Sequence, residues 1–220
     1  VAIIGRTGSG KTTLAQLLLR MYDPDQGAIT MDGIDIRQMD LHHLRKQVSY
    51  VPQDVFLFSD SIRTNIGFGM DEVNEESILG AAKAAHVHRE IESFPQQYDT
   101  VIGERGVTLS GGQKQRISIA RGLLKNPQIM VFDDCLSAVD AKTEKQIIAN
   151  LYAYLQDKTA IIVTHRIFSL FSFDKIVVLE DGRIAEMGTH EELVGNNGYY
   201  QYLFEHQQDD PEEEELAGTP

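Results

Sequence analysis

A phosphate-binding loop near the start of the chain limits the possible folds more than any other segment does. Residues 5–12 are Gly-Arg-Thr-Gly-Ser-Gly-Lys-Thr and match the pattern G-x-x-x-x-G-K-[ST]. The loop follows an apolar strand, predicted at Val1–Ile4, and begins a helix, predicted at Lys11–Met21. Strand and helix signals continue to alternate along the chain, and this alternation predicts an α/β fold with a parallel sheet.

The residues of this loop are suited to bind a nucleoside triphosphate. Glycines at positions 5, 8 and 10 let the backbone turn so that successive N–H groups converge on the β-phosphate. Lys11 can reach the β and γ oxygens, and the hydroxyl of Thr12 can bind Mg²⁺. We therefore expect ATP and Mg²⁺ as ligands, with contacts from Gly5, Arg6, Thr7, Gly8, Ser9, Gly10, Lys11, Thr12 and Thr13.

Two adjacent carboxylates form a second candidate site. The apolar run Ile129–Phe132 predicts a buried strand of a parallel sheet, and Asp133 and Asp134 follow it. At the carboxyl end of this strand, Asp133 is placed to hold Mg²⁺ through its water shell, and Asp134 would face the attacking water. A solvated acidic turn is the plainer interpretation, but a phosphate-binding loop requires an acidic partner of this kind.

The segment Leu109–Gln113 has the sequence Leu-Ser-Gly-Gly-Gln and offers a further phosphate-facing surface. A Ser-Gly-Gly run that begins an amphipathic helix presents a hydroxyl, backbone N–H groups and the positive end of the helix dipole. One chain therefore carries two surfaces that can face phosphate groups.

With these motifs in this order, the chain resembles the nucleotide-binding domain of an ABC transporter from residue 1 to about residue 208. Gln53, after the predicted strand Val48–Val51, is similar to the family's Q-loop glutamine, whose amide contacts Mg²⁺ and senses the transmembrane partner. His165, after the apolar strand predicted at Thr159–Val163, is similar to the switch histidine that contacts the γ-phosphate. By itself, His165 would more often be an ordinary loop histidine, but the strand before it and the family register favour the switch role.

The resemblance implies how the site residues divide their work. The segment Leu109–Gln113 is similar to the signature of this family. Two such domains would dimerise head to tail, with each ATP between one chain's phosphate-binding loop and the other chain's signature. Catalysis would fall to Lys11, Gln53, Asp134 and His165, and metal binding to Thr12, Gln53 and Asp133. Residues 137–140 are similar to the family's D-loop. The residues that would contact the partner's nucleotide are Ser110, Gly111, Gly112 and Gln113 of the signature and Asp140 of the D-loop-like segment.

Asp134 departs from the family pattern, which places Glu after the Mg²⁺-binding Asp. Removing one methylene shortens the reach by about 1.5 Å, and a misplacement of about 1 Å can cost roughly 100-fold in rate. We expect slow hydrolysis at this chain's own site and a different partner chain that carries the catalytic Glu. An Asp that works through an adjusted backbone or an extra water is the open alternative. A second alternative is a regulatory half that holds ATP and hydrolyses little.

Two further stretches resemble the exporter branch of the family. The loop Thr100–Gly106, with Gly103 and Glu104, is similar to the loop that touches the membrane domains in exporters. Phe56, Leu57 and Phe58 lie in a segment similar to the surface that receives a coupling helix, although they could also belong to the core. Three consecutive large apolar residues cannot all point inward from one strand, so at least one should be exposed. The Thr100–Gly106 loop disfavours a soluble ABC protein unconnected to transport.

The expected organisation is one ATPase domain of the P-loop NTPase, RecA-like class at residues 1–208, followed by an acidic disordered tail at 209–220. The core would comprise about residues 1–53 and 126–208, with an inserted α-helical lobe at about 54–125 and part of an antiparallel β subdomain. The resemblance implies a transmembrane domain upstream that this sequence lacks. It also implies a location at the cytoplasmic face of a membrane.

The charge and hydropathy of the chain limit the kinds of partner that it can bind. There are 20 Lys and Arg against 33 Asp and Glu, a net charge of −13, and this argues against nucleic-acid binding, which requires clustered Lys and Arg. The sequence contains no apolar run that approaches the roughly 18 residues needed to span a bilayer. Any membrane attachment must therefore come from elsewhere.

Overall fold

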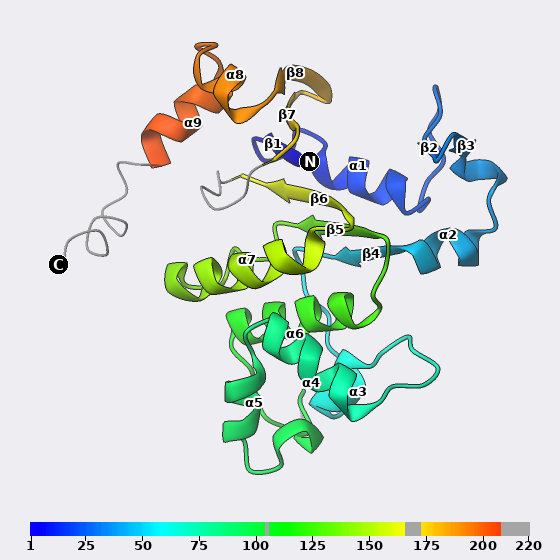
Figure 1. Ribbon diagram of the computed structural model, residues 1–220, viewed down its shortest axis with the longest axis vertical. Helices are drawn as coiled ribbons and strands as arrows, with labels where there is room; N and C mark the ends of the chain where they lie inside the picture. The colour runs from blue at the N-terminus through cyan, green and yellow to red at the C-terminus, as the bar shows by residue number, and fades with distance from the viewer. Residues whose placement is uncertain (104–105, 166–172, 208–220) are drawn as a thin grey trace. The chain divides into compact units, whose positions relative to one another are not determined.

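The computed structural model describes residues 1–103, 106–165 and 173–207, which form an α/β fold (Figure 1). The chain divides into two compact units, one with Val1–Leu14 and the described residues from Ile162 onward, the other with Ala15–Ile161. The predicted acidic tail at 209–220 lies outside the described residues. The elements are β1 (Ala2–Gly5), α1 (Lys11–Leu18), β2 (Thr30–Met31), β3 (Ile34–Asp35), η1 (Ile36–Gln38), α2 (Leu41–Gln47), β4 (Val48–Val51), α3 (Ile62–Ile66), α4 (Glu75–Ala84), α5 (His88–Ser93), η2 (Gln97–Asp99), α6 (Gly111–Leu124), β5 (Ile129–Asp133), α7 (Ala141–Leu155), β6 (Thr159–Thr164), β7 (Ile176–Glu180), β8 (Arg183–Gly188), α8 (His190–Val194) and α9 (Tyr199–Gln207).

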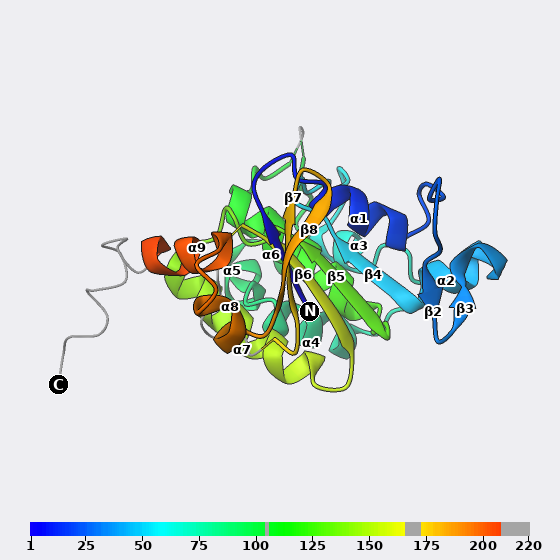
Figure 2. The same ribbon diagram turned by 90° about the horizontal axis from the view of Figure 1, so that it is seen from above.

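The first unit is built on β1, which lies between two parallel neighbours. Its register pairs Ile4 with Thr164 of β6 and Gly5 with Leu179 of β7. Strand β8 runs antiparallel to β7 after a tight turn, where Asp181 and Gly182 have φ of +48° and +75°. The core of this unit comprises Ala2, Ile4, Ile176, Val178, Leu193 and Tyr200. Figure 2 shows how α8 and α9 follow the β7–β8 hairpin.

The second unit contains the parallel pair β4 and β5, in which Val51 lies opposite Phe132. Apolar residues of β4, β5 and α1 form its core, which comprises Ala15, Leu19, Val48 and Val131. A short antiparallel pair, β2 and β3, is joined by a turn in which Asp32 and Gly33 both have positive φ. Four α-helices, α3–α6, fall between residues 54 and 125, where a helical segment is predicted; α4 and α3 both pack on α6 (Figure 1).

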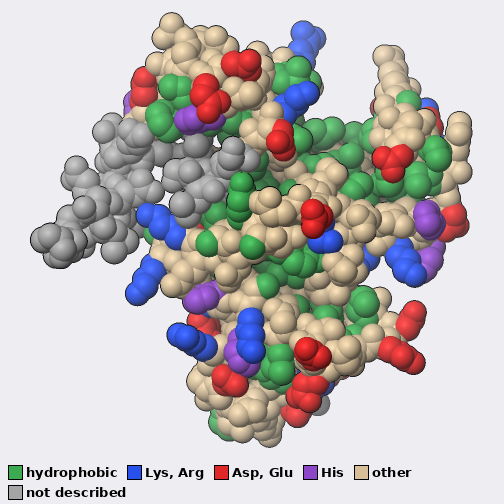
Figure 3. Space-filling view, viewed as in Figure 1, with side chains coloured by type: hydrophobic (Ala, Val, Ile, Leu, Met, Phe, Trp, Pro, Cys, Tyr) green, Lys and Arg blue, Asp and Glu red, His purple; other side chains and the backbone are tan. Residues whose placement is uncertain are grey.

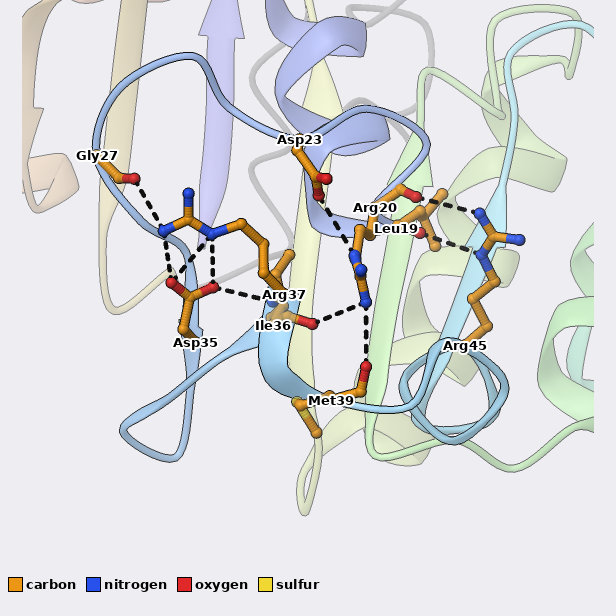
Figure 4. Close-up of polar contacts among 9 residues, drawn as sticks. All are labelled: Leu19, Arg20, Asp23, Gly27, Asp35, Ile36, Arg37, Met39 and Arg45. Atoms are coloured by element: carbon orange, nitrogen blue, oxygen red, sulfur yellow. Dashed lines mark hydrogen bonds and ion pairs between the residues drawn. The ribbon is translucent and has the colours of Figure 1, made fainter.

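Arg20 and Arg45 connect the end of α1 to the segments that follow it, and Arg37 forms contacts within those segments (Figure 4). Arg45 donates from Nε to the Leu19 carbonyl oxygen and from Nη2 to that of Arg20, each at 3.2 Å. The Nη1 of Arg20 donates to the carbonyl oxygens of Ile36 at 3.3 Å and Met39 at 3.0 Å, while Arg37 forms an ion pair with Asp35 at 2.6 Å. Cationic side chains at a helix C-terminus satisfy its free carbonyls and complement its dipole.

The element boundaries differ from the predicted ones mainly at α1. This helix ends at Leu18 rather than at Met21 because Arg20 has a φ of +50°, in the left-handed region that closes helices. The arginine contacts that stabilise this ending come from residues far along the chain, so the helical period of the sequence could not reveal it. Strand β4 has the predicted bounds, and β5 begins where predicted and extends one residue beyond the apolar run, to Asp133.

Helix α6 packs so closely on β4 that only glycine fits at position 122. A Cβ there would lie 2.8 Å from Cγ2 of Val51 and 3.2 Å from Oγ of Ser49. Val51 is fully buried and branched at Cβ, so it has little freedom to move away. Gly80, in the exposed face of α4, has nothing within 4 Å of the corresponding position.

We predict that Gly122→Ala destabilises the protein relative to Gly80→Ala. Both substitutions gain about 1 kcal/mol of helix propensity, but only the first overpacks the core, at a cost of about 1–3 kcal/mol. Urea denaturation monitored by circular dichroism should therefore give the two variants unfolding free energies that differ by about 1–3 kcal/mol. Equal stability of the two variants would contradict the close packing of α6.

Candidate functional site

The phosphate-binding loop leaves the carboxyl end of β1 and leads into α1. Gly8 and Gly10 have φ of +83° and +98°, a backbone region that favours glycine. A Cβ on Gly5 would lie 2.3 Å from the carbonyl oxygen of Leu179, its neighbour on β7. The three glycines are therefore required by the conformation of the loop itself, as the sequence predicts.

Polar atoms in this loop fit a phosphate ligand. Nζ of Lys11 donates to the carbonyl oxygens of Gly5 at 2.7 Å and Arg6 at 2.9 Å, so the amine folds back over the loop. Oγ of Ser9 is buried and has no hydrogen-bond partner among the described residues. Thr12 and Thr13 are exposed in the first turn of α1, where backbone N–H groups and the helix dipole favour an anion.

His165 lies at the same end of the sheet as this loop. It directly follows β6, whose Thr164 pairs with Ile4 of β1, so His165 and Gly5 occupy equivalent positions at the ends of neighbouring parallel strands. Its side chain is exposed. The first unit therefore brings the predicted histidine and the loop to one sheet edge.

In the second unit, Asp133 ends β5 and is only 2% exposed. The hydroxyl of Tyr50, on β4, donates to its Oδ2 at 2.8 Å. Burial, together with the hydrogen bond and charge of Asp133, raises the pKa of Tyr50 well above its usual value. Tyr50 is therefore a neutral donor at neutral pH. Only its position three residues before Gln53 could have drawn attention to it in the sequence.

Asp134 and Gln53 lie together, as a shared site requires. Nε2 of Gln53 donates to Oδ2 of Asp134 at 3.2 Å, and Oγ of Ser137 donates to the Asp134 carbonyl oxygen at 3.1 Å. Asp134 has a φ of +44°. Aspartate is one of the few residue types other than glycine that is enriched in this left-handed region, so the backbone itself favours Asp here over a longer side chain.

The Leu109–Gln113 segment begins α6 with a reciprocal cap. Oγ of Ser110 accepts from the Gln113 backbone N–H at 3.2 Å, and Oε1 of Gln113 accepts from the Ser110 N–H at 2.9 Å. The predicted helix start is therefore confirmed, with Ser110 as its N-cap. Gly112 is close to the next segment of the site, since a Cβ there would lie 2.9 Å from the Ala138 carbonyl oxygen.

Gln115 ties this helix to the segment 137–140, a role that the sequence did not reveal. It donates to Oγ of Ser137 at 3.1 Å and accepts from the Ala138 N–H at 3.0 Å. Arg116, 7% exposed, forms an ion pair with Glu90 of α5 at 2.7 Å and also donates to the His86 carbonyl oxygen at 2.8 Å. The signature helix, the D-loop-like segment and α5 are thus connected by partly buried polar contacts.

An exposed aromatic cluster lies beside α3 and α6. Phe56 is 67% exposed and Phe68 is 54% exposed, and both rings contact that of Phe58, with centroids 5.0 and 4.3 Å away. Arg121 of α6 donates to the Phe56 carbonyl oxygen at 3.1 Å and lies over the Phe58 and Phe68 rings. The expectation that at least one of the three apolar residues at 56–58 is exposed is confirmed.

The face of the α3–α6 region that Figure 3 shows carries side chains of several kinds. In the lower part of Figure 3, which corresponds to α3–α6, basic and acidic side chains lie among apolar ones. Gly103 has a φ of +115°, and a Cβ there would lie 2.4 Å from Oγ of Ser59. Glu104, the other predicted contact of this loop, lies outside the described residues. None of the described helices combines the length and apolarity needed to cross a bilayer.

Comparison with known proteins gives consistent matches. A family model described as ABC transporter matches residues 1–137. A probable multidrug resistance ABC transporter ATP-binding/permease protein of Bacillus subtilis (strain 168) is 48% identical over 219 residues, which cover 100% of this chain and 37% of that protein. An ATP-dependent lipid A-core flippase of Methylobacillus flagellatus is 45% identical over 208 residues, 94% of this chain and 36% of the relative.

A solved structure extends these matches to the fold. The structure of a bacterial Atm1-family ABC exporter with ATP bound superposes with a TM-score of 0.90 at 43% identity. The match covers 94% of this chain and 36% of that one, so the chain spans little more than a third of the length of these relatives. The predicted P-loop NTPase fold class, with a mostly parallel sheet, is confirmed by this match.

The N-cap of α7 gives a pH-dependent prediction. Asp140 accepts a hydrogen bond from the Thr143 backbone N–H at 3.0 Å, and hydrogen bonds from Thr143 lower the pKa of Asp140 below its usual 3.8. Because the folded pKa is depressed, the cap stabilises the protein above about pH 4 and is weakened as pH falls through the folded pKa.

Asp140→Ala should therefore cost about 1 kcal/mol of unfolding free energy at pH 7. The deficit relative to the wild type should shrink near pH 3. Asp140→Asn keeps a neutral cap and should retain most of the stability at both values. Urea denaturation of the three proteins at each pH measures this, and an Asp140→Ala deficit that is independent of pH would contradict it.

Proposed function

The chain belongs to the ABC transporter family, and on that premise we propose that it binds ATP with Mg²⁺ and hydrolyses ATP to drive export by a longer membrane protein. The observation that carries this proposal is the loop at the start of α1. It has three glycines required by its conformation, a lysine folded back over it, and a buried serine hydroxyl with no hydrogen-bond partner in the part of the chain that the structure describes. The substrate moved across the membrane would be chosen by parts of the protein beyond this chain.

The phosphate-binding loop would hold the triphosphate through its own donors. Lys11 would exchange its two carbonyl acceptors for the β and γ oxygens, and the backbone N–H groups of the loop would contact the β-phosphate. These charge-assisted contacts would orient the phosphates without any covalent chemistry by the protein. His165 would donate to the γ-phosphate at the neighbouring strand end.

Thr12, Gln53 and Asp133 would hold Mg²⁺, which when bound neutralises charge on the β and γ oxygens. Among the described residues, no group of three or more His, Cys, Asp or Glu side chains could hold a metal ion. This fits Mg²⁺, which is usually bound by one or two carboxylates, phosphate oxygens and water rather than by a cage of protein ligands.

The rate at the chain's own site would be limited by Asp134. Its carboxylate would orient the attacking water, assisted by Gln53, which already donates to it. Because Asp is one methylene shorter than the usual Glu, we propose that this site hydrolyses slowly. A persistent ATP-binding regulatory half is the second candidate function, and the same residue supports it.

The signature would serve a second nucleotide-binding domain in a head-to-tail dimer. Ser110, Gly111, Gly112 and Gln113, with Asp140 close by, would contact the nucleotide held by that partner. Since this signature is complete, we propose a partner chain that carries the catalytic Glu. This chain would then contribute its signature to the partner's ATP site, which would be the more active of the two sites.

The aromatic cluster would receive a coupling helix of the transmembrane domain. Phe56, Leu57 and Phe58, with Gly103 and Glu104 from the second loop, are the proposed contacts. Exposed clusters of large apolar side chains are typical of protein interaction surfaces. On this basis we propose that the chain works at the cytoplasmic face of a membrane, and such a contact would be unnecessary in a soluble, non-transport ABC protein. The proposed domain comprises residues 1–208, with the helical lobe at about 54–125.

Loss of the Lys11 amine should weaken nucleotide binding. Lys11→Ala should reduce the affinity for a fluorescent ATP analogue in the presence of Mg²⁺ by about 10- to 100-fold, because hydrogen bonds to charged groups contribute about 1.5–3 kcal/mol. Lys83→Ala, which removes an exposed lysine from α4, is the matched control and should bind as the wild type does. Undiminished binding by Lys11→Ala would contradict the assignment of the loop.

Restoring the longer carboxylate should accelerate the chain's own site. Asp134→Glu should raise ATP turnover of the isolated chain by up to about 100-fold, since a homodimer of this variant would combine an intact signature with a catalytic Glu. Asp134→Asn is the control and should not raise it. The melting temperature is measured in parallel, because Glu suits the positive φ of this position less well. Rapid turnover by the unmodified chain alone would refute the impaired site.

A further inference from the structure

A tyrosine that lies outside the recognised motifs controls the environment of Asp133. Tyr50 is paired in register with Val131, two residues before Asp133 on the same strand and therefore on the same face. Its ring packs in the core cluster that contains Val131, and its hydroxyl extends along the sheet to Oδ2 of Asp133 at 2.8 Å. The position of the hydroxyl is thus set by the packing of the ring.

This contact has a consequence for the two oxygens of the carboxylate. With Oδ2 bonded to the Tyr50 hydroxyl, rotation of the Asp133 side chain is restricted, and Oδ1 is the oxygen that would face a ligand. Gln53, the nearest amide in the sequence after Tyr50, donates to Asp134 instead. The two adjacent carboxylates therefore have different hydrogen-bond donors, one on β4 and one just beyond it.

We propose that Tyr50 is a positioning residue that orients Asp133 for Mg²⁺. The inference rests on the proposed function, because it presumes that Asp133 faces the metal of an ATP site. Hydrogen bonds to metal-binding side chains fix their orientation, and their loss typically lowers metal affinity by 10- to 100-fold. Without the hydroxyl, the buried carboxylate also loses the hydrogen bond that holds its Oδ2.

The test separates positioning from a purely structural hydrogen bond. Tyr50→Phe removes only the hydroxyl, and Tyr50→Leu provides a second hydroxyl-free variant should the first fold poorly. Tyr154→Phe is the matched control, since it removes a half-buried hydroxyl that donates to the Leu123 carbonyl oxygen at 3.0 Å in the same unit. Binding of a fluorescent ATP analogue by the full chain is measured in EDTA and in a Mg²⁺ titration.

We expect Tyr50→Phe to bind the analogue in EDTA as the wild type does but to require 10- to 100-fold more Mg²⁺ for half of the metal-dependent effect. Tyr154→Phe should leave both quantities unchanged. An unaltered or lowered Mg²⁺ requirement in the hydroxyl-free variants, or an equal increase in Tyr154→Phe, would overturn the positioning role alone. Failure of the wild type to bind the analogue would overturn the proposed function, and this inference with it.

Discussion

The parallel pairing of short apolar strands is the constraint on which the rest of the structure depends. In a parallel sheet, the carboxyl ends of neighbouring strands meet at one edge. The first unit uses this rule to place the glycine-rich loop beside His165, because β1 and β6 pair in register. The second unit uses it to place Tyr50 and Gln53 near the two carboxylates that end β5. Residues far apart in the sequence therefore become neighbours through the backbone.

At several positions the backbone approaches a neighbouring segment so closely that only glycine fits. Gly5 lies against the Leu179 carbonyl, Gly112 against that of Ala138, and Gly122 against Val51. At each of these positions a methyl group would displace a packed neighbour. Glycine thus allows the loop, the signature and α6 to approach the segments on which they depend, at the cost of a more flexible unfolded chain.

Much of the fold follows from local patterns, whereas the polar connections do not. The bounds of β4 and β5, the turns at Asp32 and Asp181 and the cap at Ser110 are all visible in the sequence, because apolar period, turn chemistry and capping act over a few residues. The early end of α1 and the contacts of Tyr50, Gln115 and Arg116 join residues at least 20 positions apart. A single sequence carries no local signal for such pairs. The site roles of the motif residues remain predictions that the proposed experiments address.

The reciprocal cap of Ser110 and Gln113 affects the association of a partner with the first turn of α6. Each side chain already satisfies the other's backbone N–H, so the first turn of α6 is ordered before any association. Docking on this turn would then require little loss of conformational entropy, and the N–H groups of Ser110 and Gln113 would keep their acceptors after separation. For the proposed head-to-tail dimer, such preorganisation would lower the entropic cost that is incurred each time the two domains associate.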